Sequence, residues 1–153
     1  NARIAAGLCP VADFRKNNVP VGLGVDGAAS NEVGGLFGEM RQALYTARIR
    51  EEQADALMPE DVLDMGTVGG AKCLGRDNLG TIDIGNPADL VVWPGNDLEG
   101  ISDPINALIL GPDRRAKHVF VAGEQRVQNG ELLGVDIHAA HQELAERAQL
   151  LWD

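Results

Sequence analysis

An acidic residue set among glycines is the strongest chemical feature of this sequence. Asp26 lies between Gly24 and Gly27, at the end of a short β-branched run over residues 19–25. A carboxylate that follows a strand, on a loop with small side chains, can reach a ligand or a metal ion. The spacing also allows a simpler interpretation, in which Asp26 bonds its own backbone in an Asx-type turn. No other part of the chain places comparably reactive residues in such a setting.

The glycines around Asp26 match the dinucleotide-binding pattern G-x-G-x-x-G over residues 22–27. We reject that interpretation because these glycines lie within and at the end of the predicted strand. The motif needs them on the turn that opens the following helix. Asp26 would also direct negative charge towards a pyrophosphate, and no acid ends a second strand about 20 residues later.

The histidines and cysteines do not form a metal site by spacing. His138 and His141 are three residues apart on a predicted helix, but a zinc site needs three or four ligands and nothing nearby completes one. We therefore expect them to be surface histidines. Cys9 and Cys73 lack a C-x-x-C partner, which predicts two reduced, partly buried thiols and excludes a zinc ribbon.

Composition limits the class of protein. The chain has 153 residues, 44% of them hydrophobic, which is enough for one domain with a sizeable core. Its formal charge of −10 disfavours nucleic acid and membrane surfaces as partners. No apolar run approaches the roughly 20 residues of a spanning helix. We expect a cytoplasmic protein. Because the chain opens on Asn1 rather than Met, we also expect processing or the tail of a longer chain.

The first half of the sequence predicts strand and helix elements that position Asp26. A buried strand is expected over 19–25, and apolar spacing predicts a helix over 35–52. Ser30 or Asn31 could cap the turn leading into that helix. Pro59 opens a second helix that continues to about residue 74, with Gly75 as its C′ residue.

The second half is richer in strands. Alternation predicts strands over 81–84 and 90–93, then a loop-rich stretch over 94–112 with an apolar segment inside it. Two further strands, 118–121 and 125–127, precede a hairpin at Asn129-Gly130. A last helix over about 137–152 has Asp136 as its expected N-cap.

Five segments carry a family resemblance. Residues 21–32 resemble the segment after the eighth barrel strand of metal-dependent amidohydrolases. Within that superfamily they look most like the heterocycle deaminases, especially the 8-oxoguanine deaminases and their cytosine, guanine and s-triazine relatives. The other resembling segments are residues 7–11, 69–75, 80–92, and 119–123 with Val127 and Gly130.

The resemblance implies an α/β fold that is the C-terminal part of a (β/α)8 TIM-like barrel. The chain would also supply the C-terminal strands of a small β-sandwich domain and a closing helix. The implied boundaries are residues 1–75 for the barrel part, 76–136 for the sandwich and 137–153 for the helix. The family's His-x-His pair, two further histidine ligands and catalytic Glu would lie upstream, so we interpret the chain as the C-terminal third of such an enzyme.

The resemblance also implies an activity. A metal-bound hydroxide would deaminate a nucleobase-like heterocycle of the 8-oxoguanine, guanine or cytosine type and release ammonia. Asp26 would be both a metal ligand and the proton-transfer residue. Ser30 and Asn31 would shape the substrate pocket, unless they are only helix caps. One divalent metal is expected, zinc with iron as an alternative, and its other ligands would lie upstream.

Two alternatives stay open. The enzyme could be an s-triazine hydrolase or another cyclic C–N amidohydrolase. The isolated chain could instead be a non-catalytic fragment or assembly module. The expected partners are a small heterocyclic substrate and the missing N-terminal part of the same protein, with homo-oligomers also allowed.

Overall fold

The computed structural model describes residues 3–27, 31, 34–95 and 98–151. The chain divides into two compact units. One comprises Asn1–Pro87 with Gly95–Arg114, and the other comprises Ala88–Pro94 with Arg115–Asp153. The first unit is helical and the second contains the sheet, so each is taken separately.

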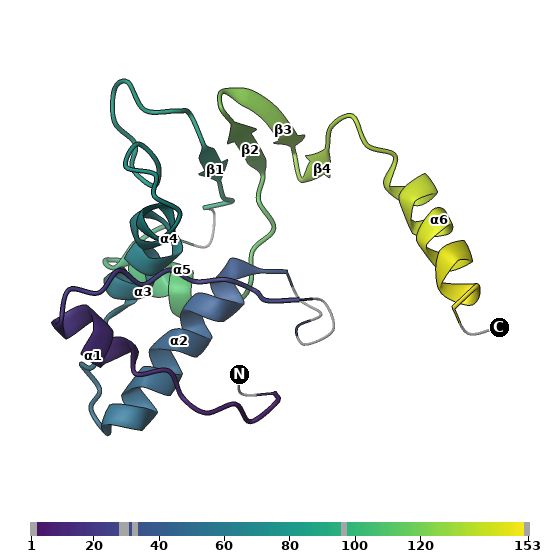
Figure 1. Cartoon of the computed structure of the whole chain (residues 1–153). Coiled ribbons are helices and arrows are strands. Elements are labelled where there is room, and N and C mark those ends of the chain that lie inside the picture. Colours follow the sequence, from purple (N-terminus) through teal and green to yellow (C-terminus); the bar gives the residue numbers. More distant parts are fainter. Residues whose placement is uncertain (1–2, 28–30, 32–33, 96–97, 152–153) are drawn as a thin grey trace. The chain divides into compact units, whose positions relative to one another are not determined.

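Five helices make up the helical unit (Figure 1). They are α1 (Val11–Lys16), α2 (Leu36–Glu51), α3 (Pro59–Gly66), α4 (Val68–Cys73) and α5 (Pro104–Leu110). The longest, α2, packs against α1, α3 and α5. The prediction of a helix over 35–52 is therefore confirmed. Its N-cap is Gly35, whose side chain cannot cap, so Asn31 is not the cap residue expected from the sequence.

The core of this unit is aliphatic and lies between α2, α3 and α5. Its fully buried side chains are Leu44, Leu57, Val62, Met65 and Ile109. Partly buried hydrophobic residues from the segment before the Asp26 loop, Val21 and Leu23, pack against it. The core therefore fixes one side of that segment.

The predicted helix that starts at Pro59 is interrupted. Thr67 has φ −125° and ψ −95°, which separates α3 from α4. Gly75 follows α4 in the left-handed conformation, with φ +66°. Its N–H donates to the carbonyl of Lys72, and the N–H of Arg76 donates to that of Ala71. This is the Schellman arrangement, so the expected C′ glycine is confirmed.

The strand predicted over 19–25 is not formed as a paired strand among the described residues. The segment is extended, and Val19 is exposed. The N–H of Leu23 donates to the carbonyl of Met65 in α3, at 3.2 Å, rather than to a neighbouring strand. Ladder pairing needs a second strand alongside, and helices occupy that position here.

The stretch 94–112 was expected to be a loop, but it contains α5. Asp103 caps this helix by accepting a hydrogen bond from the N–H of Asn106 at 2.9 Å, and Pro104 occupies its first turn. Arg41 of α2 donates to the carbonyl oxygens of Ile109, at 2.9 Å, and Gly111, at 2.5 Å. These bonds hold the end of α5 against α2.

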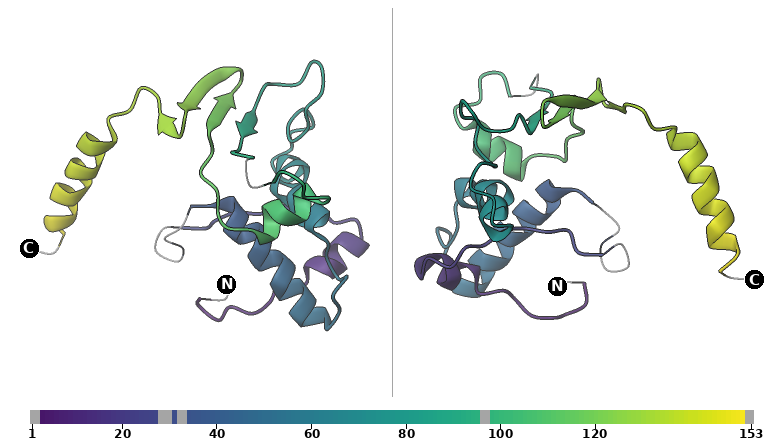
Figure 2. Two further views of the ribbon diagram at one scale, coloured as in Figure 1. Left: turned by 180° about the vertical axis from the view of Figure 1, so that it is seen from behind. Right: turned by 45° about the horizontal axis from the view of Figure 1, so that its top comes forward.

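The sheet unit contains an antiparallel four-stranded sheet in the order β1-β2-β3-β4 (Figures 1 and 2). Its strands are β1 (Leu90–Val92), β2 (His118–Val121), β3 (Glu124–Gln128) and β4 (Glu131–Leu132). The β2–β3 and β3–β4 connections are two-residue turns in which both residues have positive φ, Ala122-Gly123 and Asn129-Gly130. This confirms the predicted strands and the Asn-Gly hairpin.

The strand predicted over 81–84 is absent from the described part of the chain. Ile82 is 87% exposed and Ile84 is also fully exposed, in a turn-rich segment. Its alternating residues match a strand, but the segment lacks a neighbour with which to pair.

The C-terminal helix α6 (Ile137–Gln149) follows the sheet (Figure 2). The carboxylate of Asp136 accepts a hydrogen bond from the N–H of Ala139 at 3.0 Å, which confirms the predicted N-cap. None of the described α6 residues is buried. Among the described helices, none is both long and apolar enough to span a membrane.

Candidate active site

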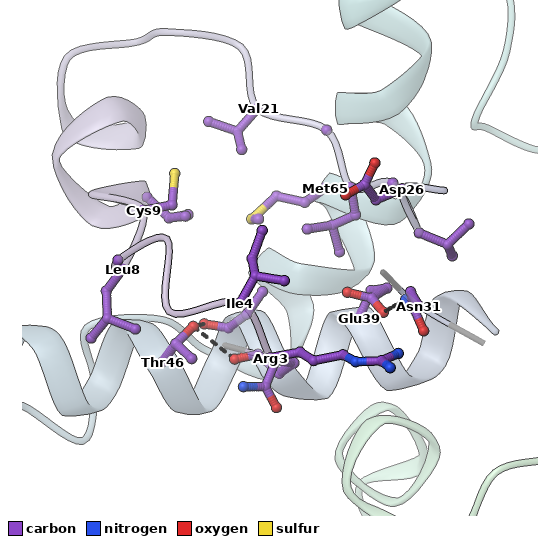
Figure 3. A pocket seen from close by; sticks show the side chains of 18 residues that line it. Arg3, Ile4, Leu8, Cys9, Val21, Asp26, Asn31, Glu39, Thr46 and Met65 are labelled. Carbon is purple, nitrogen blue, oxygen red and sulfur yellow. Dashed lines mark hydrogen bonds between the residues drawn. The ribbon is translucent and has the colours of Figure 1, made fainter. Parts of the chain in front are cut away.

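A cavity of about 440 Å³ opens beside α2 in the helical unit. Its walls come from the N-terminal segment, the extended segment before Asp26, α2, and Met65 of α3. Figure 3 shows Asp26, Asn31 and Glu39 gathered at one end, with Leu8 and Cys9 at the other. The cavity therefore has a polar end formed around the predicted catalytic loop.

Asp26 lines this cavity and has a left-handed backbone, with φ +61°. Non-glycine residues adopt that conformation mainly in turns, and aspartate and asparagine do so more readily than most. Asp26 is exposed, and the carbonyl of the next residue, Gly27, accepts a hydrogen bond from the N–H of Asn31 at 3.0 Å. Both interpretations of Asp26, turn residue and reactive carboxylate, are consistent with this position.

Asn31 reaches the same end of the cavity. Its amide nitrogen donates to Oε1 of Glu39, in the first turn of α2, at 2.6 Å. Ser30, the other predicted substrate-binding residue, lies outside the described residues. Glu39 carries no motif signal in the sequence. Its distance of eight residues from Asn31, at the start of the next helix, is the one feature that could have indicated it.

Glycines allow the segment before Asp26 to approach α4 closely. A Cβ at Gly22 would lie 2.9 Å from the Cα of Gly70, and a Cβ at Gly69 would collide with the carbonyl oxygen of Val21. Real Cβ atoms do not come so near to backbone atoms, so larger residues would push the two elements apart. The position of the Asp26 loop therefore depends on the absence of a side chain at Gly22 and at Gly69 of α4.

The two cysteines do not match their predicted environment. Both are exposed rather than partly buried, and neither forms a disulfide. Cys9 lines the cavity, at the end away from Asp26. Cys73 is the last residue of α4. Packing around these positions is too open to cover the thiols.

The histidines agree with the surface interpretation, since His138 and His141 are exposed on α6. Within the described residues, no group of three or more His, Cys, Asp and Glu side chains could hold a metal ion. A catalytic zinc ion takes about three protein ligands. The described residues alone therefore do not fit a complete metal centre, and Asp26 could supply one ligand at most.

Comparison with known proteins places this geometry in a family. The model of the amidohydrolase family matches residues 1–126. The chain belongs to the amidohydrolase family. The matched range includes the residues that line the cavity, the Asp26 loop and most of the sheet. The resemblance of those segments to metal-dependent amidohydrolases is therefore confirmed.

Curated relatives of this amidohydrolase chain are deaminases. An 8-oxoguanine deaminase from Pseudomonas aeruginosa is 40% identical over 141 residues, which is 91% of this chain and 31% of that protein. A 5-methylthioadenosine/S-adenosylhomocysteine deaminase from Halobacterium salinarum is 34% identical over 154 residues, covering 99% of this chain and 36% of the relative.

Solved structures give the same result. An adenosine deaminase from Xanthomonas campestris with bound zinc superposes with a TM-score of 0.94 at 29% identity, over 100% of this chain and 36% of that one. An atrazine chlorohydrolase from Arthrobacter aurescens complexed with zinc superposes with a TM-score of 0.87 at 31% identity. That superposition covers 95% of this chain and 33% of the chlorohydrolase chain. The chain thus spans about a third of the length of the relatives it matches.

These comparisons settle the general class. The amidohydrolase family and its deaminase members imply a TIM-barrel-type α/β fold, and the small antiparallel sheet is observed directly. The relatives are hydrolytic deaminases and triazine hydrolases, and the zinc-bound neighbours support a divalent metal in this family.

Proposed function

We propose that this chain is the C-terminal third of a metal-dependent hydrolase that deaminates a nucleobase-like heterocycle, of the 8-oxoguanine, guanine or cytosine type. The observation that carries the proposal is the position of Asp26, at the polar end of a cavity of about 440 Å³. That volume is within the range typical of small-molecule sites. The 40% identity to an 8-oxoguanine deaminase supports a purine-like substrate.

Asp26 would carry the proton in this reaction. A water oxygen bonds to the ring carbon that bears the amino group, while one water proton passes to the Asp26 carboxylate. Asp26 then delivers this proton to the amino nitrogen, the carbon–nitrogen bond breaks, and ammonia leaves. A carboxylate on an open loop suits this role because it must reach both the attacking oxygen and the departing nitrogen.

A divalent metal would increase the acidity of that water, and we propose zinc, with iron as an alternative. Asp26 would be one of its ligands. The family resemblance implies that the remaining ligands lie upstream of this chain, and the described residues hold no group of three or more suitable side chains. Asn31 would contact the substrate at the polar end of the cavity, and Ser30 is proposed for the same role on the resemblance alone.

The decisive experiment measures ammonia release by the complete protein on a panel of purines, pyrimidines, adenosine derivatives and s-triazines. Asp26→Asn should lower kcat by at least about a thousandfold, the order expected when a central proton carrier is lost. Asp55→Asn is the matched control, because Asp55 is an exposed acid of the same unit that does not line the cavity. Turnover by Asp26→Asn near the wild-type rate would refute the role of Asp26.

A second candidate function is hydrolysis of s-triazines or another cyclic C–N bond. It is favoured by the superposition on the atrazine chlorohydrolase, with a TM-score of 0.87. The same panel separates the two candidates if chloride is measured beside ammonia. Chloride release from chlorinated triazines, without ammonia release from nucleobases, would favour this second function.

A further inference from the structure

Glu39 connects the Asp26 loop to the longest helix of the chain. Its Oε1 accepts a hydrogen bond of 2.6 Å from the side-chain amide of Asn31, and this contact is partly shielded from solvent. The backbone N–H of Asn31 in turn donates to the carbonyl of Gly27, the residue after Asp26. Asn31 thus bonds Glu39 of α2 through its side chain, near Asp26 (Figure 3), and bonds the residue after Asp26 through its backbone.

The helix end of this contact is firmly held. Met40, the next residue along α2, and Leu44, about one turn further, are buried in the core, at 4% and 0% exposure. Arg41 also bonds the end of α5. Side chains held by packed helices keep their positions better than those on loops.

The chemistry of the contact also fixes the orientation of Asn31. A carboxylate only accepts hydrogen bonds, so the amide group must turn its nitrogen, and not its oxygen, towards Glu39. Bonds to a charged acceptor are shorter and stronger than neutral ones, which agrees with the 2.6 Å separation. Glu39 therefore sets both the place of Asn31 and the direction of its amide.

The backbone of Asp26 also depends on its surroundings. Its φ of +61° costs energy even for an aspartate, although less than for most non-glycine residues. The hydrogen bond between the Asn31 N–H and the Gly27 carbonyl starts at the residue that follows Asp26. Loss of the Glu39 contact would remove this side-chain bond between Asn31 and α2.

We infer that Glu39 is a positioning residue, which holds the loop of the proposed proton carrier Asp26 in its reactive place through the side-chain amide of Asn31. This inference rests on the proposed function for its catalytic consequence. Its structural part, the dependence of the loop on Glu39, does not need that function to be correct.

The test compares four variants of the complete, metal-loaded protein. Glu39→Ala should lower kcat/KM by about 10–100-fold, as is typical when a residue that orients a reactive group is lost. Glu39→Gln should keep most of the activity, since its carbonyl oxygen can still accept from Asn31. Asn31→Ala and the double variant Glu39→Ala/Asn31→Ala complete a double-mutant cycle. Because both residues act through one bond, the fold-loss of kcat/KM in the double variant should be much smaller than the product of the two single fold-losses.

Glu60→Gln is the matched control. Glu60 also lies in the first turn of a helix, α3, but it is exposed and outside the cavity. It therefore reports what the loss of a first-turn carboxylate does by itself. Three results would each overturn the inference. They are a wild-type kcat/KM in Glu39→Ala, a loss of kcat/KM in Glu39→Gln equal to that in Glu39→Ala, and a double variant whose fold-loss equals the product of the two single fold-losses. If Glu39→Ala does not fold, Asn31→Ala decides the matter, because it removes the same side-chain bond and should also speed hydrogen exchange at the backbone amide of residue 31.

Hydrogen exchange at the backbone amide of Asn31 separates this inference from the proposed function. Exchange should be faster in Glu39→Ala than in the wild type or in Glu60→Gln, whatever reaction the protein catalyses. Unchanged exchange would refute the positioning role even in an active deaminase. Faster exchange in a protein without deaminase activity would support positioning while refuting the proposed function.

Discussion

A Cβ at Gly22 would lie 2.9 Å from the Cα of Gly70, so the segment that leads to Asp26 touches α4 backbone to backbone. Contacts this close exist only between residues without side chains. The two neighbouring glycines of α4 nevertheless differ. A Cβ at Gly69 would meet the Val21 carbonyl, whereas a Cβ at Gly70 would be 3.6 Å from its nearest neighbour, the carbonyl of Met65.

This difference predicts opposite effects of two adjacent substitutions. Gly69→Ala should lower the free energy of unfolding by about 1–3 kcal/mol, because it forces the segment before Asp26 away from α4. Gly70→Ala should leave it unchanged or raise it by up to about 1 kcal/mol, since alanine favours helix and the site has room. Urea unfolding of the complete protein measures both, and equal shifts would contradict the packing described here.

The isolated 153 residues should bind zinc weakly and release no ammonia. The described residues supply no cluster of three ligands, and one carboxylate alone does not retain the metal. Equilibrium dialysis with zinc and the ammonia assay test this prediction, with the complete protein as the positive control. Stoichiometric zinc together with turnover in the isolated chain would show that it is more than a non-catalytic fragment or assembly module.

The stability of the hairpin between β3 and β4 should depend on the backbone conformation of Asn129. Asn129 has φ +51°, which alanine adopts at a cost of about 1 kcal/mol relative to glycine or asparagine. We expect Asn129→Ala to speed amide exchange in β3 and β4, while Asn129→Gly leaves it near the wild-type rate. Equal behaviour of the two variants would show that the turn is not under conformational strain.

Helix α6 should depend strongly on its cap. It has 13 residues and none of the described ones is buried, so packing adds little to its stability. Asp136→Ala removes the bond to the Ala139 N–H and should cost about 1 kcal/mol, which hydrogen exchange across α6 would detect. Asp136→Asn keeps an acceptor oxygen and should retain most of the protection. Loss of protection in both variants would point to the charge, and not the cap, as the cause.

Features that depend on neighbouring residues in the sequence were predictable. The spacing of Met40, Leu44 and Ala47 indicated α2, and Asn129-Gly130 indicated the last hairpin, because helices and tight turns are decided locally. Residues 19–25 and 81–84 have strand-like sequences, but a strand forms only with a partner, and pairing cannot be inferred from one segment.

Helix α5 and the role of Glu39 were not predicted from the sequence. The apolar residues of 105–110 were interpreted as a segment inside a loop-rich stretch, although Asp103-Pro104 is a normal helix start and the exposed Asn106 interrupts the apolar side chains. Glu39 became visible only through its bond to Asn31. The three predicted domain ranges stay a prediction for the assembled fold, since the two compact units divide the chain differently.

The return of residues Gly95–Arg114 to the helical unit has a consequence for synthesis. Ile109 is fully buried in the core of that unit, so the core stays open until this residue has left the ribosome. By then β1 has also left the ribosome, but its partner β2 has not. The helical unit can therefore close first during translation, whereas the sheet can form only after residues 118–121 have emerged. Because each unit contains two separate stretches of the chain, no single cut would separate the two units intact.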